Sequence, residues 1–246
     1  MTKLYGLIGR PISHSLSPSY MQSKWKAEGV TDCVYRLFPL PSVTELGLLL
    51  EKYPELCGLN VTSPYKEEVL DYADIIDENA STLQSANVLC ICHGKITAHN
   101  TDMEGFNALL EAIPHPLPEQ ALILGSGGAA RAACAALHSQ GVRTAIVSRK
   151  GKLDYNHLTA DTLKEYHLIV NATPIGMGPW QQQAPDIPYQ AITPAHTLID
   201  LIYNPSETPF LQFGRKQGAY TINGLPMFYA QADATWNIWK KEIHNF

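Results

Sequence analysis

The stretch ALILGSGGAARAACAALHSQGVRTAIVSRK, residues 121–150, decides the fold class of this 246-residue chain. It contains an apolar strand, a glycine loop, an alanine-rich helix that ends at Gly141, and a second apolar strand. A helix between two such strands is the usual connection between parallel neighbours in a sheet. Because short apolar runs alternate with helix-like segments throughout the chain, we predict an α/β fold with parallel strands.

The pattern of predicted helices and strands changes once along the sequence, after Asp102. A helix-like segment, MEGFNALLEAI, leads there into the proline-rich connector PHPLPEQ. Upstream, ANVLCICHGK and KITAHNTD have the pattern of two paired strands that turn at His93 and Gly94. We therefore expect two domains, with the boundary between Asp102 and Glu104.

Charge and hydropathy argue against two classes of partner. The net charge of −5 and the pI near 6.0 disfavour nucleic acid, because neutralising its phosphates needs a basic surface. No segment approaches the roughly 20 apolar residues of a membrane helix, and the N-terminus lacks the pattern of a secretory signal. We expect no membrane contact and a cytoplasmic location.

The five cysteines are an odd number in apolar surroundings, which is typical of reduced, buried thiols. Cys90 and Cys92 share one side of a predicted strand, but only His93 is adjacent in sequence as a further metal ligand. The nine histidines show no HExxH or other ligand spacing. We interpret the two cysteines as packing residues and predict no metal site.

The glycine loop LILGSGGAARA matches the pattern G-x-G-x-x-A with Gly125, Gly127 and Ala130. It follows an apolar strand and opens a long helix, which is the context that dinucleotide binding requires. The first glycine permits the turn, the second lets the backbone approach a pyrophosphate, and the alanine keeps the helix close to the strand. The alternative is a packing turn without a nucleotide. We favour a nucleotide, with contacts from Gly125, Ser126, Gly127, Gly128 and Ala129.

The end of the following strand distinguishes the cofactors. NAD-binding folds usually place an acidic residue there, which accepts hydrogen bonds from the ribose. This chain has Ser148, Arg149 and Lys150 instead. Two cations suit the 2′-phosphate of NADP, which arginine can bind through two hydrogen bonds. The three residues favour NADP; the alternative is two surface cations at a strand end.

Polar residues in the first half of the chain recur at turns and strand ends. In RPISHSLSPSY, Ser15 and Ser17 surround a turn that opens a helix, where two hydroxyls and free N–H groups suit a carboxylate. Capping of the helix by Ser17 alone is the alternative, and it leaves Ser15 without a role.

Further polar residues lie where predicted strands end. Thr62 and Lys66 follow the strand in GLNVTSPYK, Asn87 stands in SANVL, and Asp102 closes HNTD. Ligands of open α/β sheets bind outside the carboxyl ends of the strands. Lys66 and Asp102 could share a proton for a carbonyl that receives hydride. A structural ion pair is the alternative for these two, and the nucleotide fold favours catalysis.

Together, the motifs resemble the shikimate dehydrogenase family nearly from end to end. Their order and approximate spacing match those of the family. The motifs are RPISHSLSPSYM, GLNVTSPYKEEV, SAN, HNTDMEGF, LILGSGGAARA, VNATPIGM, LIDLIYNPSETPFL and NGLPMFYAQADATWNIW.

The resemblance implies reversible NADPH-dependent reduction of 3-dehydroshikimate to shikimate, on the route to chorismate and aromatic amino acids. It assigns Lys66 and Asp102 as the catalytic pair, with Lys66 as proton donor and acceptor. The implied substrate contacts are Ser15, Ser17 and Tyr203 at the carboxylate, and Thr62, Lys66, Asn87, Asp102 and Gln231 at the ring. On the cofactor side it adds Thr173, Gly224 and Met227; for Met227, a core position in an apolar helix is an equal alternative.

The resemblance also implies the domain organisation. A substrate contact from Gln231 requires the C-terminal helix to return to the first domain. We therefore expect a substrate-binding catalytic domain of residues 1–103 plus 225–246, and a Rossmann-type NADP-binding domain of residues 104–224. A homodimer is one option for the assembly, which the sequence leaves undecided.

Departures from the family pattern leave alternatives open. The family commonly has Asn-Thr where this chain has Asn87-Val88, and Asn-Arg-Thr where it has Ser148-Arg149-Lys150; the loop GPWQQQAPDIP has no functional account. One alternative is a quinate/shikimate dehydrogenase that uses NAD, against which the lack of an acidic residue near Arg149 argues. The other is a non-catalytic ligand-sensing module, against which the retained polar residues argue: Lys66, Asp102, Ser15 and Ser17.

Overall fold

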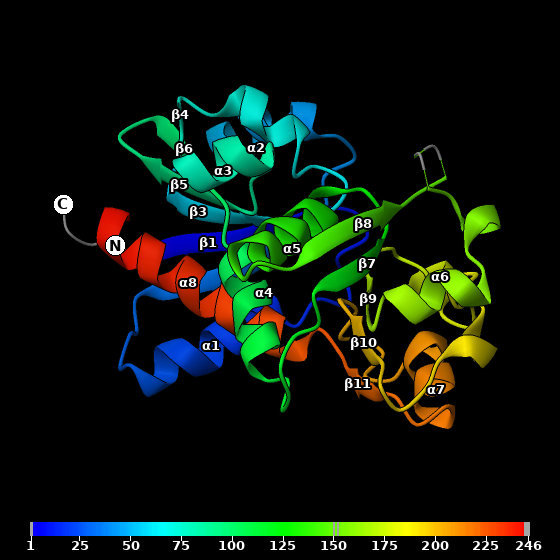
Figure 1. Cartoon of the computed structure of the whole chain (residues 1–246). Coiled ribbons are helices and arrows are strands. Elements are labelled where there is room, and N and C mark those ends of the chain that lie inside the picture. Colours follow the sequence, from blue (N-terminus) through cyan, green and yellow to red (C-terminus); the bar gives the residue numbers. More distant parts are fainter. Residues whose placement is uncertain (1, 150, 152, 244–246) are drawn as a thin grey trace. The chain divides into compact units, whose positions relative to one another are not determined.

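The computed structural model describes residues 2–149, 151 and 153–243. Backbone contacts separate two compact units, one of Met1–Thr101 with Gln231–Phe246 and one of Asp102–Ala230. Each unit is built around its own β-sheet with helices on both faces (Figure 1). The predicted α/β architecture is confirmed. Among the described residues, no helix is long and apolar enough to cross a membrane.

The sheet of the first unit has the strand order β2-β1-β3-β5-β6-β4. The strands β1, β2 and β3 are parallel, and β5 runs antiparallel to β3 and β6. The predicted hairpin is confirmed, because β5 and β6 turn at His93 and Gly94, which both have positive φ. The elements are β1 (Lys3–Ile8), α1 (Ser17–Ala27), β2 (Cys33–Phe38), η1 (Val43–Glu45), α2 (Leu46–Lys52), β3 (Leu56–Val61), η2 (Glu68–Tyr72), β4 (Ile75–Ile76), α3 (Glu78–Leu83), β5 (Val88–Cys92), β6 (Lys95–His99) and α8 (Leu225–Ile243), which belongs to this unit from Gln231 onward.

The segment after β3 forms turns followed by the 3₁₀ helix η2 and not an α-helix. The reason is a backbone bond outside the segment: the carbonyl of Lys66 accepts from the N–H of Ala86 at 2.7 Å. That carbonyl is therefore directed at the strand hairpin, away from the i+4 N–H that an α-helix would use.

The sheet of the second unit is fully parallel, with the strand order β11-β10-β9-β7-β8. Numbered along the chain this is the order 2-1-3-4-5, a doubly wound sheet whose chain direction reverses between β7 and β9. The elements are α4 (Asp102–Glu111), β7 (Gln120–Leu124), α5 (Gly128–Ser139), β8 (Arg143–Val147), η3 (Tyr155–His157), α6 (Ala160–Glu165), β9 (Leu168–Asn171), η4 (Gly178–Trp180), η5 (Tyr189–Ala191), β10 (Thr197–Asp200), α7 (Pro209–Lys216) and β11 (Tyr220–Ile222).

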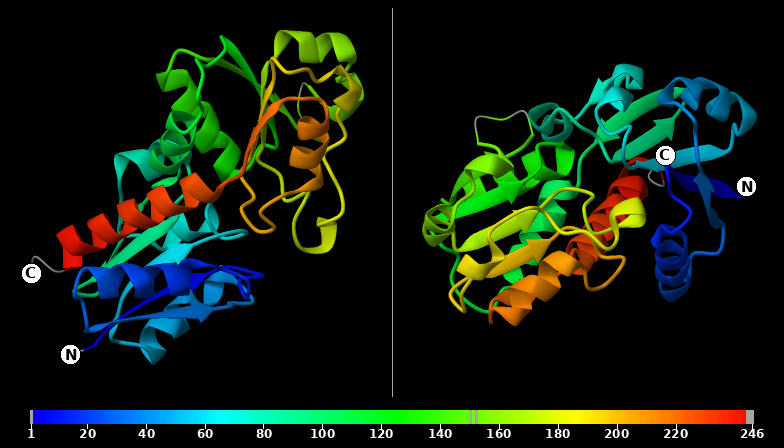
Figure 2. Two further views of the ribbon diagram at one scale, coloured as in Figure 1. Left: turned by 90° about the horizontal axis from the view of Figure 1, so that it is seen from below. Right: turned by 90° about the vertical axis from the view of Figure 1, so that its right-hand side faces the viewer.

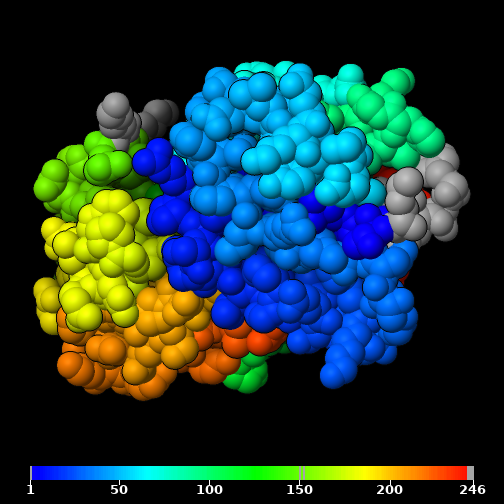
Figure 3. Space-filling model, turned by 180° about the vertical axis from the view of Figure 1, so that it is seen from behind, coloured from blue at the N-terminus to red at the C-terminus, as the bar shows by residue number. Residues whose placement is uncertain are grey.

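The strand β1 lies between β2 and β3 in the first sheet and buries both of its faces. Leu4 and Ile8 belong to the cluster shared with α2, η2 and α3, whereas Tyr5 and Leu7 belong to the cluster shared with α1 and α8. This follows from the alternation of side chains along a strand. The left view of Figure 2 shows α8 (red) running beside α1 (blue). Figure 3 shows the molecule from behind relative to Figure 1; there the N-terminal part of the chain (blue to light blue) covers most of this unit and the red helix is largely hidden.

Aromatic side chains attach α8 to the sheet. Trp236 and Trp239 are fully buried, and the ring centroid of Trp239 lies 4.6 Å from that of Tyr5. The indole N–H of Trp239 donates to the carbonyl of Leu89 on β5 at 3.1 Å. Space for this indole exists because residue 58 of β3 is a glycine: an added Cβ there would lie 2.5 Å from Nε1 of Trp239.

We predict that Gly58→Ala destabilises the protein by about 1–3 kcal/mol, the usual cost of overpacking a filled core. The new methyl group must displace the Trp239 indole and so weaken its bond to Leu89. Urea unfolding measures the change. The matched control is Gly47→Ala on the exposed surface of α2, where an added Cβ meets nothing within 4 Å. This control should gain about 0.5–1 kcal/mol from helix propensity. Equal stabilities for the two variants would contradict the packing argument.

Candidate functional site

The loops that follow β1 and β3 lie side by side at one edge of the first sheet. The N–H of Thr62 donates to the carbonyl of Ile8 at 3.0 Å, and the N–H of Arg10 donates to the carbonyl of Ser63 at 3.0 Å. The chain reverses direction across the sheet at this point, because α1 packs on one face and α2 on the other. Such a reversal leaves a crevice outside the carboxyl ends of the strands, where open α/β sheets bind ligands.

The loop after β1 brings Ser15 and Ser17 together. The hydroxyl of Ser15 donates to that of Ser17 at 3.1 Å and accepts from the backbone N–H of Ser17 at 3.2 Å. Helix α1 begins at Ser17, and the residue before it, Leu16, has no side-chain cap bond. The alternative of capping by Ser17 alone therefore does not hold: the first N–H of the helix is bonded by Ser15.

The loop after β3 holds Thr62 and Lys66. Both side chains are half-buried, and the loop turns back through a bond from the N–H of Tyr65 to the carbonyl of Thr62 at 3.1 Å. The carbonyl of Lys66 is bonded to Ala86, the residue before Asn87. The two predicted residues of this loop and Asn87 thus share one edge of the sheet.

Asn87 precedes β5, yet it lies at the same edge, because β5 runs antiparallel to β3. Its amide oxygen accepts from the N–H of Thr101 at 2.8 Å. Its amide nitrogen donates to Oγ1 of Thr101 at 3.0 Å and to Oε1 of Gln231 at 3.2 Å. The hydroxyl of Thr101 contacts the carbonyl of Gln231 at 3.3 Å. The structure therefore brings two predicted residues, Asn87 and Gln231, into one hydrogen-bonded group, and adds Thr101.

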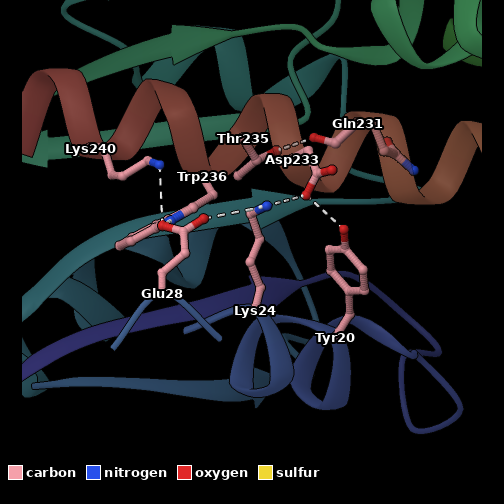
Figure 4. A network of polar contacts seen from close by, with 8 residues as sticks. All are labelled: Tyr20, Lys24, Glu28, Gln231, Asp233, Thr235, Trp236 and Lys240. Atoms are coloured by element: carbon pink, nitrogen blue, oxygen red, sulfur yellow. Dashed lines mark hydrogen bonds and ion pairs between the residues drawn. The ribbon is translucent and has the colours of Figure 1, made fainter. Parts of the chain in front are cut away.

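A polar network between α1 and α8 fixes the position of Gln231 along the sheet (Figure 4). Tyr20 donates to Asp233 at 2.6 Å, and Lys24 pairs with the same carboxylate at 2.7 Å. One turn further, the indole N–H of Trp236 donates to Glu28 at 2.8 Å. That hydrogen bond lowers the pKa of Glu28, and the bond to Asp233 raises the pKa of Lys24. The carboxylate of Glu28 and the ammonium of Lys24 therefore stay charged around neutral pH.

In the second unit, the glycine loop has the features that a pyrophosphate requires. Gly125 has φ +111, and a Cβ there would lie 3.0 Å from the carbonyl oxygen of Ala172. A Cβ on Gly127 would meet nothing within 4 Å, so this side of the loop is open. Helix α5 starts at Gly128, and no described side chain caps its amino end. An open glycine turn before an uncapped helix start fits an anionic phosphate group.

The loop after β9 contacts the glycine loop at the reversal point of the second sheet. A Cβ on Gly125 would lie 3.2 Å from Cγ2 of Thr173. Oδ1 of Asn171 accepts from the N–H and the hydroxyl of Thr173, at 3.1 and 2.6 Å. Thr173 thus lies beside the glycine loop that carries Ser126, Gly128 and Ala129, and its contact with the cofactor stays a prediction.

The other predicted cofactor residues are placed as follows. Ser148 is the first residue after β8, and Arg149 follows it with an exposed side chain; Lys150 lies outside the described residues. Gly224 is close to the end of β10, where an added Cβ would lie 2.2 Å from the carbonyl oxygen of Leu201. Met227 is 6% exposed and belongs to the core between α4, α5 and the sheet.

The remaining predicted residues belong to the same unit as the glycine loop. Tyr203 is half-buried and packs on Phe228, with ring centroids 4.7 Å apart. Asp102 is the first residue of α4 and is 1% exposed. Lys66 belongs to the first unit, so its pairing with Asp102 stays a prediction.

Sequence reasoning missed Asp200, which positions Thr173 through Asn171. Its Oδ1 accepts from Nδ2 of Asn171 at 3.1 Å and from the N–H of Ile202 at 3.0 Å, and its Oδ2 accepts from Thr208 at 2.6 Å. The side chain is fully buried at the end of β10. The available signal was one carboxylate at the end of the apolar run HTLIDLIY.

Comparison with known proteins identifies the family. The model of the "Shikimate dehydrogenase substrate binding domain" matches residues 7–89. The shikimate dehydrogenase (NADP(+)) of Ignicoccus hospitalis is 37% identical over 253 residues, which cover 96% of this chain and 92% of that protein. That of Desulforamulus reducens is 32% identical over 266 residues, covering 97% and 90%. The chain belongs to the shikimate dehydrogenase family.

A solved structure agrees over nearly the whole chain. The crystal structure of shikimate 5-dehydrogenase from Thermus thermophilus, in complex with NADP(H) and shikimate, superposes with a TM-score of 0.85 and 28% identity. The match covers 98% of this chain and 94% of that chain. The resemblance of the motifs to this family is confirmed.

We predict that Asp200→Asn removes a pH dependence from the stability. Burial raises the pKa of Asp200 from 3.8 to about 6, against the effect of its three hydrogen bonds. The folded protein therefore holds this proton more tightly than the unfolded chain. The contribution is complete below about pH 4 and is lost as the pH rises through 6. Relative to the variant, the wild type should lose up to about 3 kcal/mol of unfolding free energy over this window.

Urea unfolding at a series of pH values measures this difference. The control is Asp161→Asn on the surface of α6, where the bond from Lys164 lowers the pKa of the carboxyl. Any pH effect of the control has the opposite sign. A difference between wild type and Asp200→Asn that stays constant from about pH 4 to 7 would show that Asp200 titrates normally.

Proposed function

We propose that this chain catalyses the reversible NADPH-dependent reduction of 3-dehydroshikimate to shikimate, on the route to chorismate and aromatic amino acids. The observation that carries the proposal is the convergence of Asn87, Thr101 and Gln231 at the edge of the sheet that also holds Lys66. A polyhydroxylated acid ring needs such a group of donors and acceptors, because each of its hydroxyls loses water on binding. The family relationship supplies the substrate.

The substrate residues divide by chemistry. Ser15 and Ser17 bind the carboxylate, through hydroxyls at the start of α1, and Tyr203 assists them from the second unit. Thr62, Asn87 and Gln231 bind the ring hydroxyls. A fixed ring is what the reaction requires, since hydride and proton must reach the two ends of one carbonyl group.

Lys66 provides the proton. As the carbonyl carbon becomes tetrahedral, its oxygen takes a proton from the ammonium of Lys66, and the reverse reaction returns it. Asp102 orients the ammonium and binds a ring hydroxyl. We propose both residues as catalytic, because the motifs that carry them, GLNVTSPYKEEV and HNTDMEGF, match those of the family.

NADP is held by the second unit. The bound cofactor supplies and accepts the hydride. The glycine loop, at Gly125, Ser126, Gly127, Gly128 and Ala129, would hold its pyrophosphate, and Ser148, Arg149 and Lys150 would hold its 2′-phosphate. The nicotinamide side is lined by Thr173, Gly224 and Met227.

The domain roles belong to the same proposal. Residues 1–103 plus 225–246 bind and convert the substrate, and residues 104–224 bind NADP. We further propose a cytoplasmic location, where both small molecules are available, and a homodimer as the assembly to test first by light scattering.

Initial velocities with purified protein test the function directly. We expect turnover with shikimate and NADP, measured as nicotinamide absorbance, and much lower rates with quinate or with NAD. Faster turnover of quinate with NAD would show that the proposed substrate and cofactor preference are wrong, while the proposed reaction type, hydride transfer, would stand. Folded protein without turnover of any pair would overturn the proposal in favour of ligand sensing.

Lys66→Ala should lower kcat by about 10²–10⁴, the usual contribution of a general acid, while NADPH affinity stays within about twofold. Steady-state kinetics and NADPH fluorescence titration measure the two quantities separately. The matched control is Lys26→Ala, an exposed lysine in the last turn of α1, which should retain full turnover. Near-normal turnover of Lys66→Ala would remove this lysine from the mechanism.

A further inference from the structure

A second polar cluster lies in the first unit, where α8 crosses the hairpin of β5 and β6. Cys90 of β5, His99 of β6 and Glu242 of α8 place one sulfur, one nitrogen and one carboxylate oxygen within 4.8 Å of one another. Cys90 is 2% exposed and His99 is 8% exposed. No step of the proposed reaction uses these residues.

The contact between His99 and Glu242 is close but is not a hydrogen bond. Nε2 of His99 lies 2.8 Å from Oε1 of Glu242. Its direction does not suit an N–H donor, and among the described residues this buried nitrogen has no hydrogen-bond partner. A buried nitrogen without a partner is costly. An atom bound between the nitrogen and its neighbours would remove that cost.

The second ring nitrogen of His99, Nδ1, has the kind of carboxylate partner that metal-binding histidines have. Nδ1 of His99 lies 2.7 Å from Oδ2 of Asp77, whose other oxygen accepts from the N–H of Ala80 at 2.7 Å. This contact occupies Nδ1 and leaves Nε2 as the ring nitrogen that can bind a metal. Metal-binding histidines in proteins commonly have this carboxylate partner.

The donor set selects the metal. A thiolate, an imidazole and a carboxylate together suit Zn²⁺, whose bonds of about 2.0–2.3 Å put neighbouring donors roughly 3.4–3.7 Å apart in a tetrahedron. The three donor atoms lie within 4.8 Å of one another, and the 2.8 Å contact between His99 and Glu242 needs to open by about 0.6 Å to reach that spacing. The side chain of Glu242 is 31% exposed, so an ion and a fourth ligand, water, can enter from solvent.

We propose that Cys90, His99 and Glu242 form a structural zinc site, with Asp77 supporting His99. In the metal-free protein, burial raises the pKa of the Cys90 thiol and the nearby Glu242 carboxylate raises it further. The sulfur then keeps its proton. Bound Zn²⁺ replaces that proton and links the last turns of α8 to the sheet, which stabilises the folded protein. The inference does not depend on the proposed reaction.

Cobalt titration of the chelator-treated full-length protein tests the site. Co²⁺ should bind one per chain with the near-ultraviolet charge-transfer band of a cobalt–thiolate bond, and Zn²⁺ should displace it. Added Zn²⁺ should raise the unfolding temperature relative to protein in chelator. Absence of a one-to-one thiolate band in the wild type would overturn the proposal and leave the cluster as a hydrogen-bonded contact.

Matched variants assign the ligands. Cys90→Ala should abolish the charge-transfer band, while Cys134→Ala, which removes a buried thiol in the second unit, should retain it. Because a core variant can lose stability for other reasons, Glu242→Gln provides a second test on a partly exposed residue. It should weaken Co²⁺ binding at least tenfold, whereas Glu51→Gln on α2 should not. A band that survives both Cys90→Ala and Glu242→Gln would place the metal elsewhere.

Discussion

Trp236 and Trp239 hold the last helix against a sheet whose strands all come from the first 101 residues. The first unit is therefore complete only when the end of the chain has packed against its beginning. The two indoles are fully buried against Tyr5, Trp25 and their neighbours, a contact that removes a large apolar surface from water. Gly58 makes the contact possible by leaving room for one indole.

The same helix serves two ends of the sheet. Gln231 and Glu242 are 11 residues apart, which is three helical turns and about 16 Å, so both project from the face of α8 that covers the strands. Gln231 joins Asn87 and Thr101 at one end, and Glu242 reaches His99 and Cys90 at the other. Any change that slides α8 along the sheet moves both groups together, because a helix shifts as a rigid element. Two ion pairs between α1 and α8, Lys24 with Asp233 and Glu28 with Lys240, oppose such a shift.

The sequence predicted those features that depend on neighbouring residues. The glycine loop, its helix and the hairpin at His93 and Gly94 follow from local patterns, and the structure contains all three. Contacts between distant residues had no such signal. Cys90 was interpreted as a packing residue because Glu242 lies about 150 positions further along the chain, and only folding makes them neighbours. Asp200 was missed because no local pattern indicates its hydrogen bonds to Asn171 at the end of β9 and to Thr208 at the N-cap of α7.

The position of Val88 in the fold limits the effect of this residue on the polar group around Asn87. The resemblance to the family leads to an expectation of threonine at residue 88, so the valine there indicated, from the sequence alone, the loss of one hydroxyl near the substrate. In the structure Val88 is fully buried, in the cluster with Tyr5 and the last helix. Strand alternation directs neighbouring side chains to opposite faces, so Val88 serves the core while Asn87 contributes to the polar group. A hydroxyl is present beside Asn87 all the same, because Thr101 supplies one at 3.0 Å from its amide nitrogen. The polar group at this edge therefore keeps its hydrogen bonds, and the valine adds apolar surface to the contact that holds α8 in place.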